Sequence, residues 1–177
     1  FKIKNSRFIG ETCLVGTVEQ ALERLNAIRK REYDATHHCY AYQVGLFRQM
    51  QFKYSDDGEP SGTAGKPIYD RLAGSHLSNL LIVVTRYYGG TQLGTGGLTH
   101  AYSDAARLVL DASGSQEHFI QSELDLLIDF TLYDRVQRLV SKLGASIVSS
   151  DFSDQVRLRL SIRQSLAEQL RNDLIEL

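Results

Sequence analysis

The sequence lacks an excess of charge of either sign. Its 177 residues contain 20 lysines and arginines against 21 aspartates and glutamates, which gives a formal net charge of −1. Proteins that hold nucleic acid mainly through its phosphates carry clustered basic residues, because phosphate contacts supply most of that affinity. The composition therefore excludes a broad basic surface, and any basic site must be local.

Cysteine and long apolar runs are also scarce. Cys13 and Cys39 are too few for a disulfide framework and form no CxxC motif, which is typical of a reducing, intracellular setting. No run approaches the ~20 apolar residues of a membrane span. We expect a soluble, cytoplasmic protein with no membrane partner. Because the chain starts at Phe1 and not at Met, we expect its true N-terminus to lie further upstream, so the lack of a signal peptide carries little weight.

Proline occurs only twice, and both prolines fall in one loop, Ser55–Pro67. Proline fixes φ where glycine frees it, so this loop is predicted to be a rigid, shaped connection and not a flexible linker. Its other notable residues are acidic, small or hydroxylated: Asp56, Asp57, Glu59, Gly62, Thr63 and Gly65.

Glycine is concentrated in a second loop. The apolar run Leu80–Val84 predicts a central strand, and five of the fourteen glycines lie in the nine residues from Gly89 to Gly97. Glycine permits positive φ and the close approach of a backbone or a ligand. A strand, such a loop and then a helix start are where backbone amides and the helix dipole converge on anions.

The remaining patterns predict two domains. Residues 1–115 read as a strand at 6–15, a helix from 18 capped by Thr17 with Gln20, a hairpin over 37–54, a short helix ending near Gly74 and a helix over 98–110. Residues 118–177 read as β-α-β-β-α, with strands at 119–130, 145–150 and 156–162. This order matches a ferredoxin-like sandwich whose last strand would lie beyond Leu177 or be missing.

Arg86 follows the apolar run, beside the glycine loop, and suggests an anion site. A phosphate would be held by Arg86, Lys66 and the residues Gly94, Thr95, Gly96 and Gly97. Tyr87 and Tyr88 could stack on bases. The alternative is structural: the glycines serve a tight turn, and Arg86 pairs with Asp56, Asp57 or Glu59.

The sequence contains no clear pattern for a metal site or for a catalytic group. His37 and His38 are adjacent in a predicted strand and point to opposite faces, so only one of them could join the acids of the Ser55–Pro67 loop in a metal site. No hydroxyl has a triad context. We predict no catalytic residue, no metal site and no cofactor, and we make no prediction of oligomeric state.

Two strings, Tyr54–Pro67 and Val83–Leu98, resemble the signatures of the IMPACT/YigZ family, as does the His37-His38 pair. The resemblance is close over residues 1–115 and weaker over 118–177. It implies an α+β protein with an N-terminal ribosomal protein S5 domain 2-like fold and a C-terminal ferredoxin-like domain akin to the last domain of elongation factor G. The family motif maps onto Asp56, Asp57, Gly58, Glu59, Pro60, Gly62, Thr63, Ala64, Gly65, Pro67, Arg86, Gly89, Gly90, Gly94, Gly96 and Gly97.

Eukaryotic members of this family act in translational control, so the resemblance implies a non-enzymatic, translation-associated protein that contacts RNA or a ribosomal or translation-factor partner. The alternative is a phosphate- or nucleotide-binding small-molecule enzyme that uses an S5-like fold as some kinases do, with a metal held by Asp56, Asp57 or Glu59. In a third interpretation both loops are structural, and residues 118–177 offer an interaction surface.

Overall fold

The computed structural model describes residues 1–177 and divides them into two compact units, Phe1–Ser115 and Gln116–Leu177. Both units are mixed α+β, and each contains one antiparallel sheet. The α+β class predicted from the sequence is confirmed. No helix is both long and apolar enough to span a membrane.

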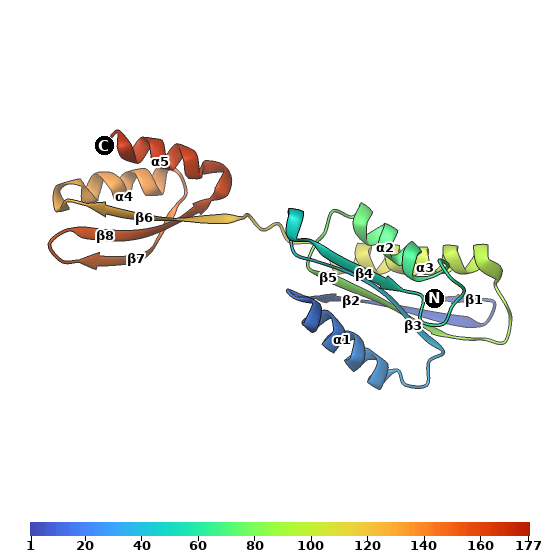
Figure 1. The fold of residues 1–177 in the computed structure, drawn as a ribbon. Coiled ribbons are helices and arrows are strands. Elements are labelled where there is room, and N and C mark those ends of the chain that lie inside the picture. The colour runs from blue at the N-terminus through green and yellow to red at the C-terminus, as the bar shows by residue number, and fades with distance from the viewer. The chain divides into compact units, whose positions relative to one another are not determined.

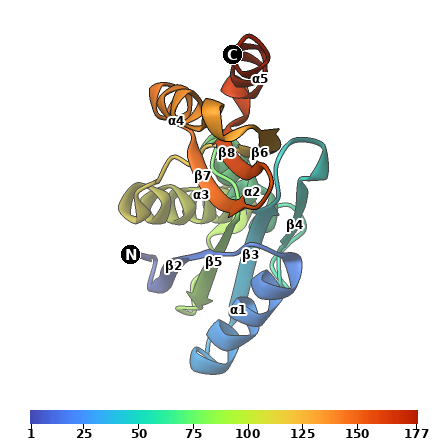
Figure 2. The same ribbon diagram turned by 90° about the vertical axis from the view of Figure 1, so that its left-hand side faces the viewer.

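The N-terminal unit is built on a five-stranded sheet in the order β1-β2-β5-β3-β4. Figure 2 shows β2, β5 and β3 following one another across it. The strands are β1 (Lys2–Ile3), β2 (Ser6–Leu14), β3 (His37–Val44), β4 (Gln51–Ser55) and β5 (Leu80–Tyr87).

The central strand β5 divides two hydrophobic cores, since its side chains alternate between the faces of the sheet. Ile82 and Val84 join the core under the helices α2 (Gly65–Gly74) and α3 (Gly94–Ser113). Leu81 and Val83 join the core under α1 (Val18–Arg31). The helices accordingly lie on opposite faces of the sheet (Figure 1). Burial on both faces explains the unbroken apolar run of β5.

Helix α1 begins as its sequence predicts, with one difference. The Thr17 hydroxyl accepts from the Gln20 amide at 3.3 Å. The Gln20 side chain, however, accepts from the Gly16 amide at 2.7 Å instead of returning to Thr17. The second hydrogen bond of the capping box therefore comes from the amide of Gly16, one residue before the N-cap Thr17.

The C-terminal unit has the predicted β-α-β-β-α order. It consists of β6 (Gln121–Ile128), α4 (Tyr133–Lys142), β7 (Ser146–Phe152), β8 (Val156–Arg163) and α5 (Ala167–Ile175), with sheet order β6-β8-β7. Both helices pack on one face, where alternate residues of β8 are buried. The opposite face carries charges, among them Arg159 and Asp125, which pair at 2.9 Å.

Helix α3 starts earlier than its sequence pattern indicates, at Gly94 instead of Leu98, and α2, for which the sequence predicted only an end near Gly74, begins at Gly65. Both first turns contain glycine, which has low helix propensity and so hides a helix start from a sequence pattern. Arg86 lies inside β5 and not after it, where it pairs with Phe8 of β2 and His37 of β3.

Candidate functional site

Asp56 organises the first motif loop around its carboxylate. One oxygen accepts from the amides of Ala64 at 2.9 Å and Gly65 at 2.8 Å, and the other accepts from Gly62 at 2.9 Å. A carboxylate in this position satisfies orphan amides at the start of α2 and complements its dipole. The N-terminus of α2 is thereby neutralised from within the protein.

Asp57 ties the same loop to α1 and β3. Its carboxylate accepts from the Arg29 guanidinium at 2.6 Å and from the His38 amide at 2.7 Å. Its carbonyl oxygen lies 2.8 Å from Nδ1 of His37. Because a carbonyl only accepts, that ring nitrogen carries the proton, and Nε2 of His37 faces Glu59 at 3.8 Å.

Glu59 and Arg86 form a buried ion pair, with Arg86 Nη1 at 2.6 Å from Glu59 Oε1 and side-chain exposures of 5% and 3%. The Tyr102 hydroxyl of α3 donates to the same carboxylate oxygen at 2.7 Å. Of the three acids that the structural alternative offered to Arg86, Glu59 is therefore the partner. A buried charge needs such compensation, because leaving it alone costs several kcal/mol.

Arg86 has further contacts, but not for every donor. Nη2 donates to the Ser6 hydroxyl at 3.2 Å, and the guanidinium lies 5.4 Å from the Phe8 ring centroid and 5.3 Å from that of Tyr88. Its Nε is buried and has no hydrogen-bond partner. Buried donors are almost always paired, so this Nε is an exception within the unit.

Two neighbouring groups are held in their neutral forms. Burial, with Cys39 and Glu59 nearby, raises the pKa of Tyr102, so its hydroxyl remains a donor to Glu59. Burial also raises the pKa of the Cys39 thiol, which donates to the Asp56 carbonyl at 2.9 Å. Neither group has the lowered pKa of a nucleophile.

A cavity of about 520 Å³ opens beside the ion pair. This volume is in the range of small-molecule sites. Its lining combines charged, hydroxylated, aromatic and apolar residues from both sequence motifs: Thr36, His37, Glu59, Pro60, Arg86, Tyr88, Gln92, Leu93, Gly94, Thr95 and Leu98.

The first turn of α3 borders this cavity through Gly94 and Thr95. The residue before it, Leu93, has no side chain that could accept from the first amides, and no side-chain cap is present. A 20-residue helix with an uncapped start presents unsatisfied N–H groups and the positive end of its dipole. The cavity thus brings the uncapped start of α3 beside the Arg86–Glu59 pair.

Several predicted site residues lie elsewhere. Lys66 is exposed on α2, pairs with Asp70 at 2.5 Å and does not line the cavity. Tyr87 donates to Glu32 at 2.7 Å, and its ring lies 4.2 Å from the Arg7 guanidinium carbon. Gly96 and Gly97 belong to the first turn of α3 without contributing to the lining. Thr63 is buried and donates to the Pro60 carbonyl within its own loop.

The three acids proposed as metal ligands in the enzyme hypothesis all have internal partners. The Asp56 carboxylate accepts hydrogen bonds from three amides. The Asp57 carboxylate accepts from Arg29 and one amide, and the Glu59 carboxylate accepts from Arg86 and Tyr102. No group of three or more His, Cys, Asp or Glu side chains is placed to hold a metal ion.

The sequence patterns did not identify Ser6 or Tyr102. Tyr102 occupies a core position of α3, and only its hydroxyl, which must find a partner when buried, hinted at a polar role. The Ser6 hydroxyl also accepts from the Gly89 amide at 3.2 Å, a contact between residues 83 positions apart that carries no local signal.

Comparison with known proteins accounts for both units. Residues 4–110 match the Impact N-terminal domain, and residues 126–177 match a domain of unknown function, DUF1949. The chain belongs to the IMPACT family. IMPACT family member YigZ of Escherichia coli (strain K12) is 36% identical over 162 residues, covering 91% of this chain and 79% of that protein. An IMPACT family member of Haemophilus influenzae is 36% identical over 176 residues, covering 99% and 85%.

Eukaryotic IMPACT proteins match over a shorter stretch. The Protein IMPACT homolog of Dictyostelium discoideum is 33% identical over 100 residues, which is 55% of this chain and 28% of that protein. A solved structure described as a hypothetical protein superposes with a TM-score of 0.67 at 34% identity, covering 99% of this chain and 86% of that one. Both loops that contribute to the cavity, 55–67 and 89–97, lie within the residues that match the Impact N-terminal domain.

Proposed function

We propose that this IMPACT family member is a translation-related regulatory protein of the cytoplasm that acts by binding, and that its cavity takes a phosphate group of RNA. The translation role rests on family membership. The RNA contact rests on one observation, the meeting of buried Arg86 and the uncapped amides of α3 in a cavity of about 520 Å³.

The contrast between α2 and α3 supports a phosphate at α3. Asp56 already supplies an anion to the first amides of α2. The corresponding amides of α3 have no such side chain, although α3 is twice as long. Helix N-termini of this kind bind phosphate through their amides and dipole. A bound phosphate would accept from the first amides of α3, as the Asp56 carboxylate accepts from those of α2.

The glycines differ in a way that also favours a ligand. A Cβ at Gly89 would lie 2.1 Å from the carbonyl carbon of Asn5, and one at Gly65 would lie 2.6 Å from that of Ser55, so packing requires both glycines. A Cβ at Gly96 would meet nothing within 4 Å. Neither packing nor a positive φ requires glycine at this position, which lies outside the lining but directly follows the lining residue Thr95, so an amide open to a ligand at the helix start is consistent with it.

The apolar part of the lining suits a base. The Tyr88 ring is half-exposed, and Pro60, Leu93 and Leu98 supply apolar contacts. Aromatic rings stack on bases without sequence preference. Because Glu59 neutralises Arg86, attraction comes from directed N–H donors and not from net charge, which agrees with the chain's formal charge of −1.

The finer fold assignment belongs to the same proposal. We assign the N-terminal unit to the ribosomal protein S5 domain 2-like fold and the C-terminal unit to the ferredoxin-like fold of the last domain of elongation factor G. The element order β-α-β-β-α and the sheet order β6-β8-β7 support the second assignment.

The test uses Thr95→Asp, which places a carboxylate at the cavity. Acidic residues favour a helix N-terminus, so the variant should remain folded while its charge repels phosphate. Thr131→Asp, at an exposed position of the C-terminal unit, is the matched control. We expect wild type and Thr131→Asp to bind a short RNA oligomer at low salt, and Thr95→Asp to bind it at least about tenfold more weakly.

Two results would overturn the RNA proposal. One is the absence of any binding of RNA oligomers by the wild type at low salt. The other is equal binding by wild type and Thr95→Asp. An enzyme that holds a metal would instead require one of the three loop acids to leave its internal partners, and nothing in the site favours that function over binding.

A further inference from the structure

The β3–β4 hairpin exposes an apolar surface at the edge of the N-terminal sheet. Five large apolar side chains within nine residues are substantially exposed: Leu46, Phe47, Met50, Phe52 and Tyr54. Large apolar side chains gathered at a sheet edge are unusual, because natural proteins protect their edges with charge, proline or a covering element.

The strand that carries this surface has one free edge. β4 pairs only with β3 and lies at the end of the sheet order. Every second residue of such a strand directs its N–H and C=O groups outward, and another extended chain can pair with them. The edge and the apolar side chains therefore coincide on the same five residues, Gln51–Ser55, and the turn before them.

Phe47 is the most unusual residue of this surface. Its φ is +51°, and 80% of its side chain is exposed. A positive φ is rare for a bulky residue and costs free energy. An aromatic ring placed in solvent at that cost gains nothing from the fold of the isolated unit.

The aromatic rings favour peptide side chains over nucleobases. Tyr69 of α2 stacks on Phe52 with ring centroids 4.7 Å apart, and on Tyr54 at 5.5 Å. One face of Phe52 and one face of Tyr54 are thus covered by Tyr69, which leaves these two rings less face for stacking on a base.

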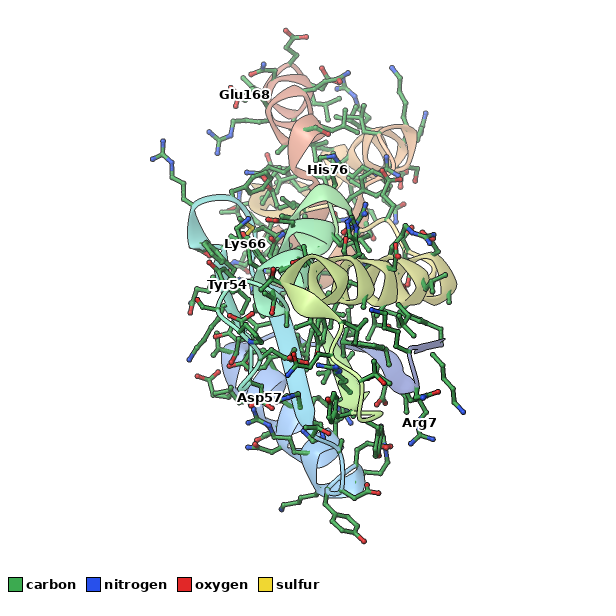
Figure 3. The ribbon with its side chains drawn as sticks, turned by 90° about the vertical axis from the view of Figure 1, so that its right-hand side faces the viewer. Arg7, Tyr54, Asp57, Lys66, His76 and Glu168 are labelled. Carbon is green, nitrogen blue, oxygen red and sulfur yellow. The ribbon has the colours of Figure 1, made fainter.

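The charges around this surface are basic. Arg48 and Lys53 lie within it, and no acidic residue occurs between Leu46 and Ser55. Lys66, at the start of α2, also lies beside Tyr54 (Figure 3), but its charge is paired with Asp70, so the unpaired charges are those of Arg48 and Lys53. A second copy is a poor occupant, because antiparallel pairing of two β4 strands about their centre would set Lys53 against Lys53, and like charges opposite each other destabilise a sheet.

We propose that β4 binds an extended segment of a partner protein by strand addition, and that this segment alternates apolar and acidic residues. Its backbone pairs with the free edge, its apolar side chains pack on Phe47, Met50 and Phe52, and its carboxylates face Arg48 and Lys53. The surface is distinct from the cavity at Arg86, so this inference is independent of the proposed RNA contact.

The test screens the full chain against a displayed library of random peptides about ten residues long, the upper range of natural strands. Phe47→Asp removes the ring and adds a repelling charge, and Asp tolerates positive φ better than Phe does, so folding is preserved. Tyr33→Asp is the matched control, since Tyr33 is 83% exposed and lies outside the hairpin.

We expect enriched peptides that alternate apolar and acidic residues, bind wild type and Tyr33→Asp equally, and bind Phe47→Asp at least about tenfold more weakly. Amides of β4 should exchange more slowly in the complex, and N-methylation of the peptide backbone should abolish binding. The proposal is overturned if no peptide is enriched, if Phe47→Asp binds as wild type does, or if the N-methylated peptide still binds. Competition by short RNA for the same surface, or Phe47-dependent self-association of the chain, would equally overturn it.

Discussion

Arg86 donates to Glu59 across 2.6 Å in the interior of the N-terminal unit, although 27 residues separate them in the chain. Each comes from a different family motif, so the pair joins the acidic loop to the glycine loop. The same pair forms one wall of the cavity. The stability of the unit and the proposed binding site therefore involve the same two side chains.

Replacing Glu59 tests the structural half of this dual role. Glu59→Ala leaves Arg86 buried without its counter-charge, and removing one partner of a buried pair costs about 3–5 kcal/mol. We expect a loss of that size in the free energy of unfolding measured with urea. The control is Asp70→Ala, which breaks the exposed pair with Lys66 and should leave the urea midpoint unchanged. A Glu59→Ala variant as stable as wild type would show that the pair contributes nothing.

A substitution at Gly96 is expected to change the stability of the fold and the proposed RNA binding in opposite directions. Since a Cβ there meets no atom within 4 Å, Gly96→Ala should raise the free energy of unfolding by about 0.4–1 kcal/mol through the lower entropy of the unfolded chain. If the amide receives a phosphate, the added methyl should also weaken RNA binding at least about tenfold.

Gly89→Ala provides the contrast, because its Cβ would collide with the Asn5 backbone and must destabilise the unit. Thermal unfolding and RNA titration of both variants give the comparison. A Gly96→Ala variant that is more stable and binds RNA as wild type does would remove the glycine argument.

Tyr87 should govern part of the alkaline stability. Its hydrogen bond to Glu32, with further contributions from burial and Asp34, raises its pKa to about 12 from 10.0. The stabilisation is fully present below pH 10 and is lost as pH rises toward 12, because the unfolded tyrosine ionises first. We expect a shallower loss of stability over this range in Tyr87→Phe, measured by urea unfolding at several pH values.

A second variant checks the cause of that pKa. Glu32→Ala removes the largest contribution, the hydrogen bond accepted by Glu32, so the Tyr87 pKa should move back toward its ordinary value. Ultraviolet difference titration of the tyrosines would detect the change. Identical titrations of wild type and Glu32→Ala would rule out this hydrogen bond as the cause.

The sequence predicted local features best. The cap at Thr17, the buried strand β5 and the helical face of α4 each depend on residues a few positions apart. The start of α3 was missed because glycine obscures helical periodicity, and only packing on the sheet overrides its low propensity.

For the candidate site, the sequence could not predict which residues far apart in the chain contact one another. Sequence alone left Arg86 with three possible acidic partners, and the fold selects Glu59 because Asp56 and Asp57 are engaged by amides and Arg29. The contact of Arg86 with Ser6 spans 80 residues and follows only from the pairing of β2 with β5.

The two units share no hydrophobic core, and residues 114–120, which span the boundary between the units, contain no helix or strand. Unfolding of the whole chain need not be all-or-none when cores are separate. The chain has no tryptophan, so one introduced into a single unit would report that unit's melting alone. If the units unfold separately, a substitution in one unit lowers or raises the free energy of unfolding of that unit and leaves the other unit unchanged.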